Sequence, residues 1–404
     1  MSPRRRIPAA HSSEHVICVS GAAAPRIARG HPWVFREAVA GGGRGLEAGE
    51  VVEVRGPAGE PLGRGLWDPR SPIAVRLYGR ELSALPDAGG LARIVEQALL
   101  KRDRLFDKGD TTAYRLCNGE GDRIPGLVLD RYGSVVVLST DGEAMAAWVA
   151  PLAERIWPML EPRGARSLVR RVAAPDRDED RTEPLVGELV PGSITVLENG
   201  MAMVVDIARG QKTGAFLDQR DNRARVRRIA QGRRVLNLFS YAGGFSIAAA
   251  LGGARHVTSV DVAQPVHATA QRAMRANGID PSAHTFVSAD VFSFLELARR
   301  RQTTWDLVIS DPPSFAPSQK ARARALGAYR RLHRACAAVL SEGGLLCASS
   351  CSSHVTLEDF VCTLDDEALG RRDLGLMGLF GLPCDHPTVP AWPEGRYLKF
   401  AMLG

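Results

Sequence analysis

The sequence predicts an α/β protein in which a large C-terminal part follows two smaller units. Three observations carry this prediction. From about residue 206 onward, strand-like runs alternate with helical patterns, as in a parallel sheet covered by helices on both faces. The residues before about 80 read as short β-strands broken by turns, and the stretch between mixes strands with helices. The length of 404 residues also suits two or three domains.

The N-terminal strand-like runs are "HVICVS", "VVEVRG", "PLGRGLWD" and "PIAVRLYG", between residues 14 and 80. A small β-unit on a basic chain is typical of nucleic-acid-binding modules, although a purely structural β-domain fits the same pattern. In "PRIARGHPWVF", Arg26 and Arg29 could contact phosphates, while Trp33 and Phe35 could stack on bases. A core position explains Trp33 equally well, and we favour that role.

The middle unit, roughly residues 81 to 205, is predicted to be α+β. Apolar residues recur at helical spacing from Leu91 to Lys108, and a second helix is expected near Ala144 to Leu160. The segment "RVAAPDRDEDRTEP" reads as a charge-rich loop, and "SITVLENGMAMVVDI" as a hairpin that turns at Asn199 and Gly200.

The C-terminal part alternates strands and helices. Its expected strands are "RRVLNLFS", "HVTSVD", "HTFVSAD", "WDLVISD" and "GGLLCASSC". Helices are expected from Gly244, near Val266 to Asn277, and near Leu326 to Leu340, with a further helix between the third and fourth strands. We find no internal repeat and no low-complexity tract.

The composition indicates a globular protein with a basic balance. Hydrophobic residues make up 45% and charged residues 24%, which is enough for a sizeable core in each domain. The net charge of +7 and a pI near 9.2 are compatible with phosphate-bearing partners. A coding bias toward arginine would produce the same balance without any nucleic-acid binding.

Cysteine usage and the apolar runs favour a cytoplasmic protein without metal or membrane span. The seven cysteines are odd in number and form no C-x-x-C pair of the kind expected at zinc sites. The basic start "MSPRRRIPAAHSS" is followed by no apolar core of signal-peptide length, so no export is expected. The uncharged run from Val235 to Ala254 contains polar residues and four glycines, which suits a strand, a tight loop and a helix start.

Polar residues at the ends of the expected strands are the candidates for a ligand site, because open α/β sheets bind ligands beyond the carboxyl ends of their strands. In "NLFSYAGGFS", Gly243 and Gly244 would let the backbone approach a ligand, although the G-x-G-x-x-G fingerprint is absent. Asp261 could accept hydrogen bonds from a ribose, and Asp290 could meet an adenine ring. Each acid alone is more often a helix N-cap, but successive strand ends of this kind indicate a nucleoside cofactor.

The fourth strand ends in "SDPPSF", which predicts a stiff turn. Pro312 and Pro313 have fixed φ and lack amide donors, so the turn would hold Asp311 and nearby carbonyls toward a planar substrate. A plain strand-to-loop exit is the alternative.

These motifs together resemble a known family. "NLFSYAGGFS", "SVD", "SAD" and "DPPSF" look like the successive motifs of the class I S-adenosylmethionine-dependent methyltransferases. More narrowly, "GQKTGAFLDQRDNR", "NGEGDRIPGLVLDRYG", "GHPWVF", "SCSS" and "HPTVPAWPEGRYLK" resemble the PUA-domain-containing bacterial enzymes that make 5-methylcytosine in 23S ribosomal RNA. The resemblance spans nearly the whole chain.

The resemblance implies a PUA-like RNA-binding domain at 1–80, a middle α+β domain at 81–205 and a Rossmann-like class I methyltransferase domain at 206–404. It implies S-adenosyl-L-methionine as cofactor, Asp311 and Cys351 as the residues that act on the base, and a lid or positioning element of unassigned contacts at Lys212, Asp218, Gln219 and Arg220. The expected cofactor-binding residues are Phe239, Ser240, Gly243, Gly244, Asp261, Asp290 and Asp311.

The choice between two cysteines follows from strand position. In "LLCASSC", Cys347 lies inside the apolar run, whereas Cys351 sits at its polar end beside small serines that would admit a flat ring. We therefore expect Cys347 to be buried and inert and Cys351 to be the nucleophile. A thiolate at carbon 6 of cytosine makes carbon 5 reactive enough to accept a methyl group. The base that removes the carbon 5 proton is not identified.

The expected activity is methylation of carbon 5 of a cytidine in 23S ribosomal RNA or a large-subunit precursor, with the target base unpaired or flipped out. Two alternatives stay open. One is an RNA methyltransferase that acts on an exocyclic amine, for which Cys351 would be dispensable, and the other is a non-catalytic RNA-binding assembly factor. Formation of a homodimer is left open as well.

Overall fold

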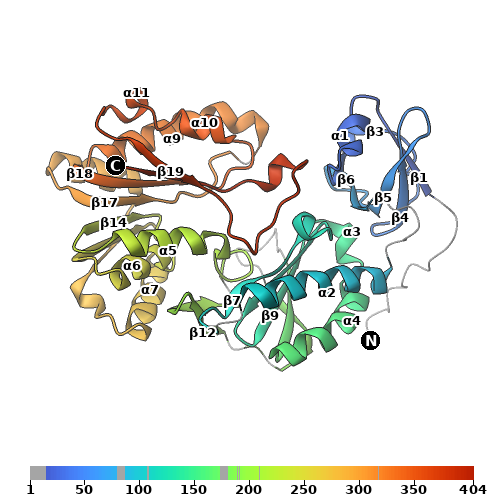
Figure 1. Cartoon of the computed structure of the whole chain (residues 1–404), viewed down its shortest axis with the longest axis horizontal. Helices are drawn as coiled ribbons and strands as arrows, with labels where there is room; N and C mark the ends of the chain where they lie inside the picture. Colours follow the sequence, from blue (N-terminus) through green and yellow to red (C-terminus); the bar gives the residue numbers. More distant parts are fainter. Residues whose placement is uncertain are drawn as a thin grey trace. The chain divides into compact units, whose positions relative to one another are not determined.

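The structure is a computed structural model that describes residues 15–79, 87–106, 109–172, 181–188, 190, 192–208, 210–316 and 318–404 (Figure 1). The chain divides into two compact units. The first unit comprises Met1–Gly192, Asp206–Ala215 and Asp385–Gly395, and the second comprises Ser193–Val205, Phe216–Cys384 and Arg396–Gly404. The division into three domains at residues 80 and 205 stays a prediction, and its first boundary lies outside the described residues.

The predicted N-terminal β-unit is a six-stranded sheet within the first unit. Its elements are β1 His15–Val19, α1 Ala24–Ala28, β2 Trp33–Phe35, β3 Val39–Gly41, β4 Val51–Arg55, β5 Pro61–Trp67 and β6 Ile73–Gly79. The strand order is β2-β6-β5-β4-β1-β3, with β1 and β4 parallel and the other neighbours antiparallel. Alternate side chains such as Ile17, Val34 and Val54 are fully buried and form a small core of their own.

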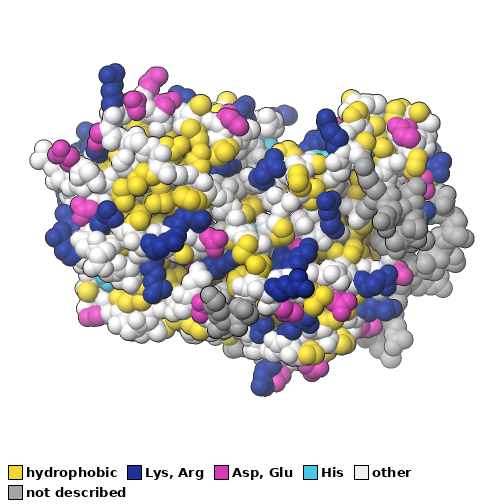
Figure 2. Space-filling model, in the orientation of Figure 1, with side chains coloured by type: hydrophobic (Ala, Val, Ile, Leu, Met, Phe, Trp, Pro, Cys, Tyr) yellow, Lys and Arg dark blue, Asp and Glu magenta, His cyan; other side chains and the backbone are white. Residues whose placement is uncertain are grey.

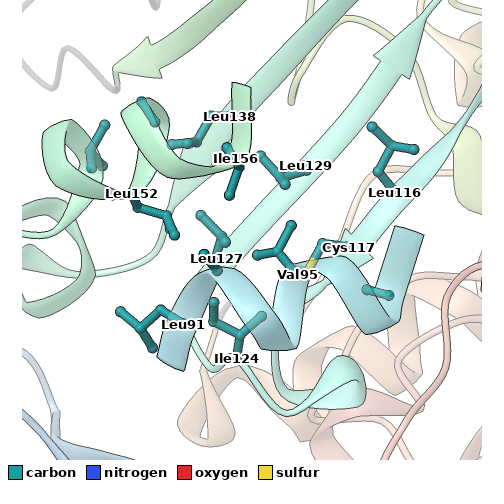
Figure 3. Close-up of a cluster of buried hydrophobic side chains, with 14 of the residues drawn as sticks. Leu91, Val95, Leu116, Cys117, Ile124, Leu127, Leu129, Leu138, Leu152 and Ile156 are labelled. Carbon is teal, nitrogen blue, oxygen red and sulfur yellow. The ribbon is translucent and has the colours of Figure 1, made fainter. Parts of the chain in front are cut away.

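A second sheet of the first unit carries the predicted middle α+β region. Its elements are α2 Ala88–Leu105, β7 Ala113–Asn118, β8 Leu127–Tyr132, β9 Val135–Thr140, α3 Glu143–Ala146, α4 Val149–Leu160, β10 Ser167–Val172 and β11 Arg181–Gly187. The strand order is β11-β10-β9-β8-β7. Figure 3 shows the core in which α2 and α4 cover this sheet, with Leu91, Val95, Leu152 and Ile156 from the helices against Leu127, Leu129 and Leu138.

The two helices predicted in this region are present, with one difference. The helix expected from Leu91 to Lys108 is α2, although Lys108 itself lies outside the described residues. The helix expected from Ala144 to Leu160 is instead a short α3 and a longer α4. Pro151 lies in the first turn of α4, where a proline is tolerated because its missing amide has no partner there, whereas α3 could not continue through it. A second proline, Pro158, lies in the last turn of α4. Of the charge-rich loop, residues 173–180 lie outside the described residues.

The predicted hairpin is confirmed as β12 Ser193–Glu198 and β13 Met201–Asp206. Asn199 and Gly200 both have left-handed φ, 49° and 73°. This is the conformation of a two-residue hairpin turn, and it explains why Asn-Gly stands there.

The second unit is built on the predicted α/β sheet. Its strands are β14 Arg234–Leu238, β15 His256–Asp261, β16 Thr285–Ser288, β17 Trp305–Ser310, β18 Leu340–Ser350, β19 Leu376–Phe380 and β20 Lys399–Leu403. The order is β16-β15-β14-β17-β18-β20-β19, and the first five are parallel to one another. β20 and β19 are antiparallel additions at one edge. β14 therefore lies between β15 and β17, where the order of the strands reverses and ligands bind in such sheets.

Helices cover both faces of this sheet (Figure 1). They are α5 Arg220–Ile229, α6 Gly244–Leu251, α7 Gln264–Ala276, α8 Val291–Arg300, α9 Arg322–Ala337, α10 Leu357–Val361 and α11 Asp366–Leu369. Along β17, Leu307 and Ile309 enter the core under α5 and α6, while Val308 enters the core under α8 and α9. This alternation shows why the strand sequences are almost continuously apolar.

Two general features of the surface and interior bear on function. Within the described part of the chain, no helix combines the length and the hydropathy needed to cross a membrane, and no group of His, Cys, Asp and Glu could hold a metal ion. Figure 2 shows Lys and Arg side chains distributed over the face drawn, and an apolar patch where Figure 1 places β19. Leu376, Met377 and Leu379 on that strand are exposed.

Candidate functional site

The loop after β14 has an unusual backbone. Phe239 and Tyr241 adopt left-handed φ values of 57° and 45°, which bulky residues rarely do. Gly243, the N-cap of α6, has φ of 80°, and a Cβ there would lie 2.6 Å from the Cβ of Ala270 on α7. Only glycine fits this conformation and this close approach. Left-handed conformations of this kind cluster at ligand sites, so the loop predicted from "NLFSYAGGFS" is a credible cradle.

Asp261 ties this loop to the end of β15. One carboxylate oxygen accepts a hydrogen bond from the Tyr241 amide at 2.8 Å, and the other accepts from the Ala263 amide at 3.0 Å. Asp261 is half-buried and thus retains a solvent-facing side. The adjacent Val262 is 78% exposed, which is unusual for a branched aliphatic residue. Such an apolar side chain beside a candidate ribose-binding acid is a feature that strand-end reasoning missed.

Asp290 is exposed at the end of the third parallel strand and caps α8. Its carboxylate accepts hydrogen bonds from the Ser293 amide at 2.9 Å and from the Ser293 hydroxyl at 3.0 Å. The helix-cap alternative therefore describes what the side chain does in this structure. Both capping bonds use the same oxygen, Oδ1.

Asp311 follows β17 and is held by Gln219. The Gln219 side-chain amide donates to Oδ1 of Asp311 at 2.9 Å and to the Ser349 hydroxyl of β18 at 3.0 Å. Its carbonyl accepts from Asn222 of α5 at 2.6 Å. Gln219 is 3% exposed. The sequence left the contacts of Gln219 unassigned. In the structure, its buried side chain links the carboxyl ends of the neighbouring strands β17 and β18.

The other three residues of the expected lid segment do not share one set of contacts. Asp218 is buried and accepts a hydrogen bond from the Tyr397 hydroxyl at 2.7 Å. Arg220, also buried, begins α5 and lies 3.5 Å from the Asp221 carboxylate. Lys212, with a left-handed φ of 54°, belongs to the first unit.

The two candidate cysteines differ as expected in burial. Cys347 is fully buried in β18, and its burial raises the pKa of the thiol to about 12, so it stays protonated and inert. Cys351 is half-buried and follows directly after the last residue of β18. Its Sγ lies 3.9 Å from the carbonyl oxygen of Pro312, in the turn that begins with Asp311. The thiol and the acid therefore stand at the ends of adjacent parallel strands.

Ser352 joins these two strand ends to helix α9. Its hydroxyl lies 3.0 Å from the Ser314 hydroxyl and 3.1 Å from the Tyr329 hydroxyl. Tyr329 is fully buried, and burial raises the pKa of its phenol. The sequence indicated Ser352 only as a small neighbour of Cys351, and it gave no signal for Tyr329, because the contact between them depends on how the turn and helix α9 pack together.

Comparison with known proteins decides the family. A family profile described as S-adenosylmethionine-dependent methyltransferase matches residues 160–390, and one described as a PUA-like domain matches residues 17–80. The chain belongs to the S-adenosylmethionine-dependent methyltransferases. Its predicted fold class, a PUA-like domain followed by a class I methyltransferase fold, is confirmed.

Relatives of the methyltransferase cover nearly all of it. It is 35% identical over 379 residues to ribosomal RNA large subunit methyltransferase I of Escherichia coli strain K12, which covers 92% of this chain and 94% of the relative. The crystal structure of SMU.776, a methyltransferase complexed with SAH, has a TM-score of 0.85 at 27% identity and covers 96% of this chain and 99% of that one. A SAM-dependent methyltransferase from Streptococcus mutans has a TM-score of 0.84 at 28% identity, with the same coverage.

The loop of the methyltransferase fits its cofactor chemically. Ser240 is buried, and within the described residues its hydroxyl has no hydrogen-bond partner. A buried hydroxyl without a partner is costly, and a polar ligand beside it would remove that cost. Together with the glycine backbone at 243 and 244 and the acids at 261 and 290, the loop offers the donors and acceptors that a nucleoside with an amino-acid tail requires.

Trp33 of the PUA-like domain contacts residues elsewhere in the first unit. The Trp33 indole donates to Glu120 at 2.7 Å, and its ring lies edge-on to that of Trp392, with 5.1 Å between centroids. Trp33 is half-buried and is not part of the buried core of the sheet, so the favoured core position was wrong, although its side chain is engaged with other residues of the first unit. Arg26 is paired with Glu394, whereas Arg29 is exposed.

Proposed function

We propose that this methyltransferase methylates carbon 5 of a cytidine in 23S ribosomal RNA through a covalent bond to Cys351. The observation that carries the proposal is the half-exposed thiol of Cys351, placed beside the Pro312 carbonyl in the turn of Asp311. The matched relative, named for the ribosomal RNA large subunit, supports the substrate class, as do the PUA-like domain and the net charge of +7.

Cys351 is the group that activates the base. As a thiolate it adds to carbon 6 of the cytosine, and the electrons of the 5,6 double bond move through the ring toward nitrogen 3 and oxygen 2. Carbon 5 then carries enough electron density to accept a methyl group. Removal of the proton from carbon 5 restores the double bond and expels the thiolate, which returns Cys351 unchanged.

Asp311 is proposed to hold the ring during this addition. Its carboxyl, protonated or bridged to nitrogen 3 by a shared proton, would stabilise the charge that the addition places in the ring. The buried side chain of Gln219 donates a hydrogen bond to Oδ1 of Asp311, which would fix the orientation of the carboxyl before the base arrives. The rigid Asp-Pro-Pro turn keeps this geometry without reorganisation.

The cofactor is proposed to lie against the loop after β14. S-adenosylmethionine supplies an electrophilic methyl group on a sulfonium centre. Asp261 would accept from the ribose hydroxyls, Asp290 would meet the adenine, and Val262 would pack on its face. Phe239, Ser240, Gly243 and Gly244 would border the amino-acid tail, and Asp311 would face the methyl group.

We also propose that the domain boundaries lie at residues 80 and 205 and that the protein acts in the cytoplasm. We further propose that two copies can pair as a homodimer. The exposed apolar side chains of the edge strand β19 are the surface that would support pairing. Sedimentation of the purified protein across concentrations measures it directly.

A trapping experiment tests the mechanism. In RNA that contains 5-fluorocytidine, fluorine replaces the hydrogen at carbon 5, and a base cannot remove it. The final elimination is therefore blocked, and the wild-type protein should form a stable covalent adduct with this RNA. Cys351→Ala should form none and should show background turnover on ordinary RNA. Cys347→Ala is the matched control, and it should keep both adduct formation and turnover. Normal turnover by Cys351→Ala would eliminate the cysteine mechanism.

One alternative retains a specific observation in its favour. An Asp-Pro-Pro turn also suits methylation of an exocyclic amine, since Asp311 could accept a proton of the amino group. Nuclease digestion of the methylated RNA followed by mass spectrometry separates 5-methylcytidine from an N-methylated base. A non-catalytic assembly factor would instead show no saturable binding of S-adenosylmethionine in calorimetry.

A further inference from the structure

Lys399 is a buried ammonium group beside the strand end that carries Cys351. It is the first residue of β20 and pairs with Ser350 of β18 in the sheet register. Its side chain is 4% exposed. Nζ donates to the backbone carbonyls of Ser352 at 2.6 Å, Val355 at 2.8 Å and Tyr397 at 2.8 Å. All its protons are thereby used.

The burial of this charge requires an explanation. Moving an ammonium group out of water costs several kcal/mol unless other charges or dipoles compensate. A neutral donor could tie carbonyls together at a lower desolvation cost. Within the described residues, Lys399 forms no ion pair with a carboxylate, so the compensation comes from carbonyl dipoles and from more distant anions.

The groups that surround Lys399 leave one partner for its charge. Burial lowers the pKa of Lys399 to about 8, whereas attraction to Cys351 and to Asp359 raises it. Asp359 already forms a two-point pair with Arg322, at 2.9 and 2.5 Å, so its charge is met. On the other side, Tyr329 and Asp311 interact electrostatically and Tyr329 also interacts with Cys351, but neither supplies a cation. Among the described groups that act on Lys399, this leaves Cys351, which would be an anion as a thiolate.

We propose that Lys399 is a positioning residue for Cys351, whose ammonium holds the turn from Ser352 to Val355 and favours the thiolate form of the neighbouring sulfur. The inference rests on the proposed role of Cys351 as nucleophile. It assigns to the antiparallel strand β20 a function in catalysis.

The sign of the pH dependence follows from the two groups. An ordinary thiol has a pKa near 8.5, and a neighbouring positive charge lowers that value. Lys399 is charged below its pKa of about 8, so the charge favours the thiolate in the physiological range and is lost as the pH rises above that value. Removal of the charge should therefore slow Cys351 chemistry most at neutral pH and least at high pH.

The experiment measures the alkylation rate of Cys351 by iodoacetamide between pH 6 and pH 10, with peptide mass spectrometry on the full-length protein. Lys399→Met should raise the apparent pKa of Cys351 by about one unit and slow alkylation at pH 7 about tenfold. Lys399→Arg, which keeps the charge, should restore most of the rate. The exposed Cys362 is an internal reference in every sample. Lys320→Met, a loss of charge at an exposed position, should match the wild type.

Each outcome decides the proposal. An unchanged pH profile in Lys399→Met overturns it, and so does an Arg variant as slow as the Met variant. Lys399→Gln, which keeps donors but not charge, replaces Met if thermal melting shows that the Met variant is unfolded, and the same profiles then apply. The 5-fluorocytidine adduct is scored separately. A shifted profile without any wild-type adduct would refute the cytosine mechanism while leaving the Lys399 effect intact.

Discussion

A single buried amide, that of Gln219, connects the acid at the end of β17 with the strand that leads to Cys351. It donates to Asp311 and Ser349 and accepts from Asn222, so these three polar residues meet at one side chain. At the scale of single residues, the order of the proposed site thus comes from hydrogen bonds that do not themselves touch the reacting atoms.

Replacement of Gln219 by alanine should damage both stability and activity. The substitution removes three hydrogen bonds of this buried side chain, which costs about 1 to 3 kcal/mol in the free energy of unfolding. It also removes the hydrogen bond that Gln219 donates to Asp311, so kcat should fall more than the affinity for S-adenosylmethionine. Urea denaturation and initial rates measure the two effects. Gln302→Ala, at an exposed position of the same unit, should change neither. A fully active Gln219→Ala protein would show that the function of Asp311 does not depend on its hydrogen bond with Gln219.

Asp261→Asn should weaken cofactor binding selectively. The substitution removes the charge that holds the Tyr241 and Ala263 amides and that would accept from the ribose. Hydrogen bonds to charged groups contribute about 1.5 to 3 kcal/mol, so the Kd for S-adenosylmethionine should rise about tenfold to a hundredfold. Calorimetry measures it. Asp280→Asn, which removes a comparable Asp cap at an exposed turn, is the control and should bind normally.

The site residues that could be predicted from the sequence are those at or just after the end of a strand. Asp261, Asp290, Asp311 and Cys351 follow apolar runs, and the parallel sheet brings such ends to one edge. The hydrogen bonds that Gln219 and Lys399 donate could not be predicted. Gln219 and Asp311 are 92 residues apart in the sequence, and Lys399 and Ser352 are 47 residues apart. No local pattern encodes such contacts.

At the scale of elements, the entry into α6 depends on a glycine in two ways. Gly243 has a left-handed φ, and its Cα faces Ala270 of α7 closely. Gly278, just beyond α7, has a similar φ of 71° with open space where a Cβ would stand. The two positions separate backbone strain from crowding.

Gly243→Ala should therefore destabilise the second unit more than Gly278→Ala. A side chain at a left-handed position costs about 1 kcal/mol in both variants. Overpacking adds about 1 to 3 kcal/mol at position 243 alone. Urea denaturation of both variants gives the difference, and Gly243→Ala should also weaken cofactor binding. Equal losses would mean that α7 moves aside freely.

Elements with a strong local pattern were predictable from the sequence. The Asn199-Gly200 hairpin and the parallel strands follow from turn chemistry and apolar runs. The break between α3 and α4 was not expected, although Pro151 marks it. β19 and β20 were not predicted as strands, since an edge strand such as Leu376–Phe380 has a glycine in its middle and exposed apolar residues on its surface.

At the scale of the whole molecule, the two units should respond to acid at different pH. His333 is fully buried in α9, and burial lowers its pKa to about 4. The unfolded chain binds a proton at this residue near pH 6.5, so stability is lost as the pH falls from 6.5 toward 4, by about 3 kcal/mol at most. In the first unit, burial opposes the charge of Glu394, but hydrogen bonds from His31 and Arg26 prevail and lower its pKa to about 2. Its contribution is lost only as the pH falls below 4.5.

An acid titration followed by circular dichroism and tryptophan fluorescence checks this order. The second unit, which contains Trp305, should weaken first, and His333→Gln should move that transition to lower pH because glutamine does not titrate. Glu394→Gln should leave the upper transition unchanged and alter the lower one. A wild-type transition that His333→Gln does not shift would contradict the assignment.

The alternation of the two units along the chain has a consequence for biosynthesis. The first unit is completed by residues 385–395, in which the Asp385 carboxylate accepts from the Arg115 amide at 2.9 Å, and its carbonyl accepts from Arg102 at 2.7 Å. A ribosome that has translated only the first 384 residues has therefore finished neither unit. Both units can close only after residues 385–404 have been translated, so the apolar core surfaces of both stay exposed on the nascent chain until then.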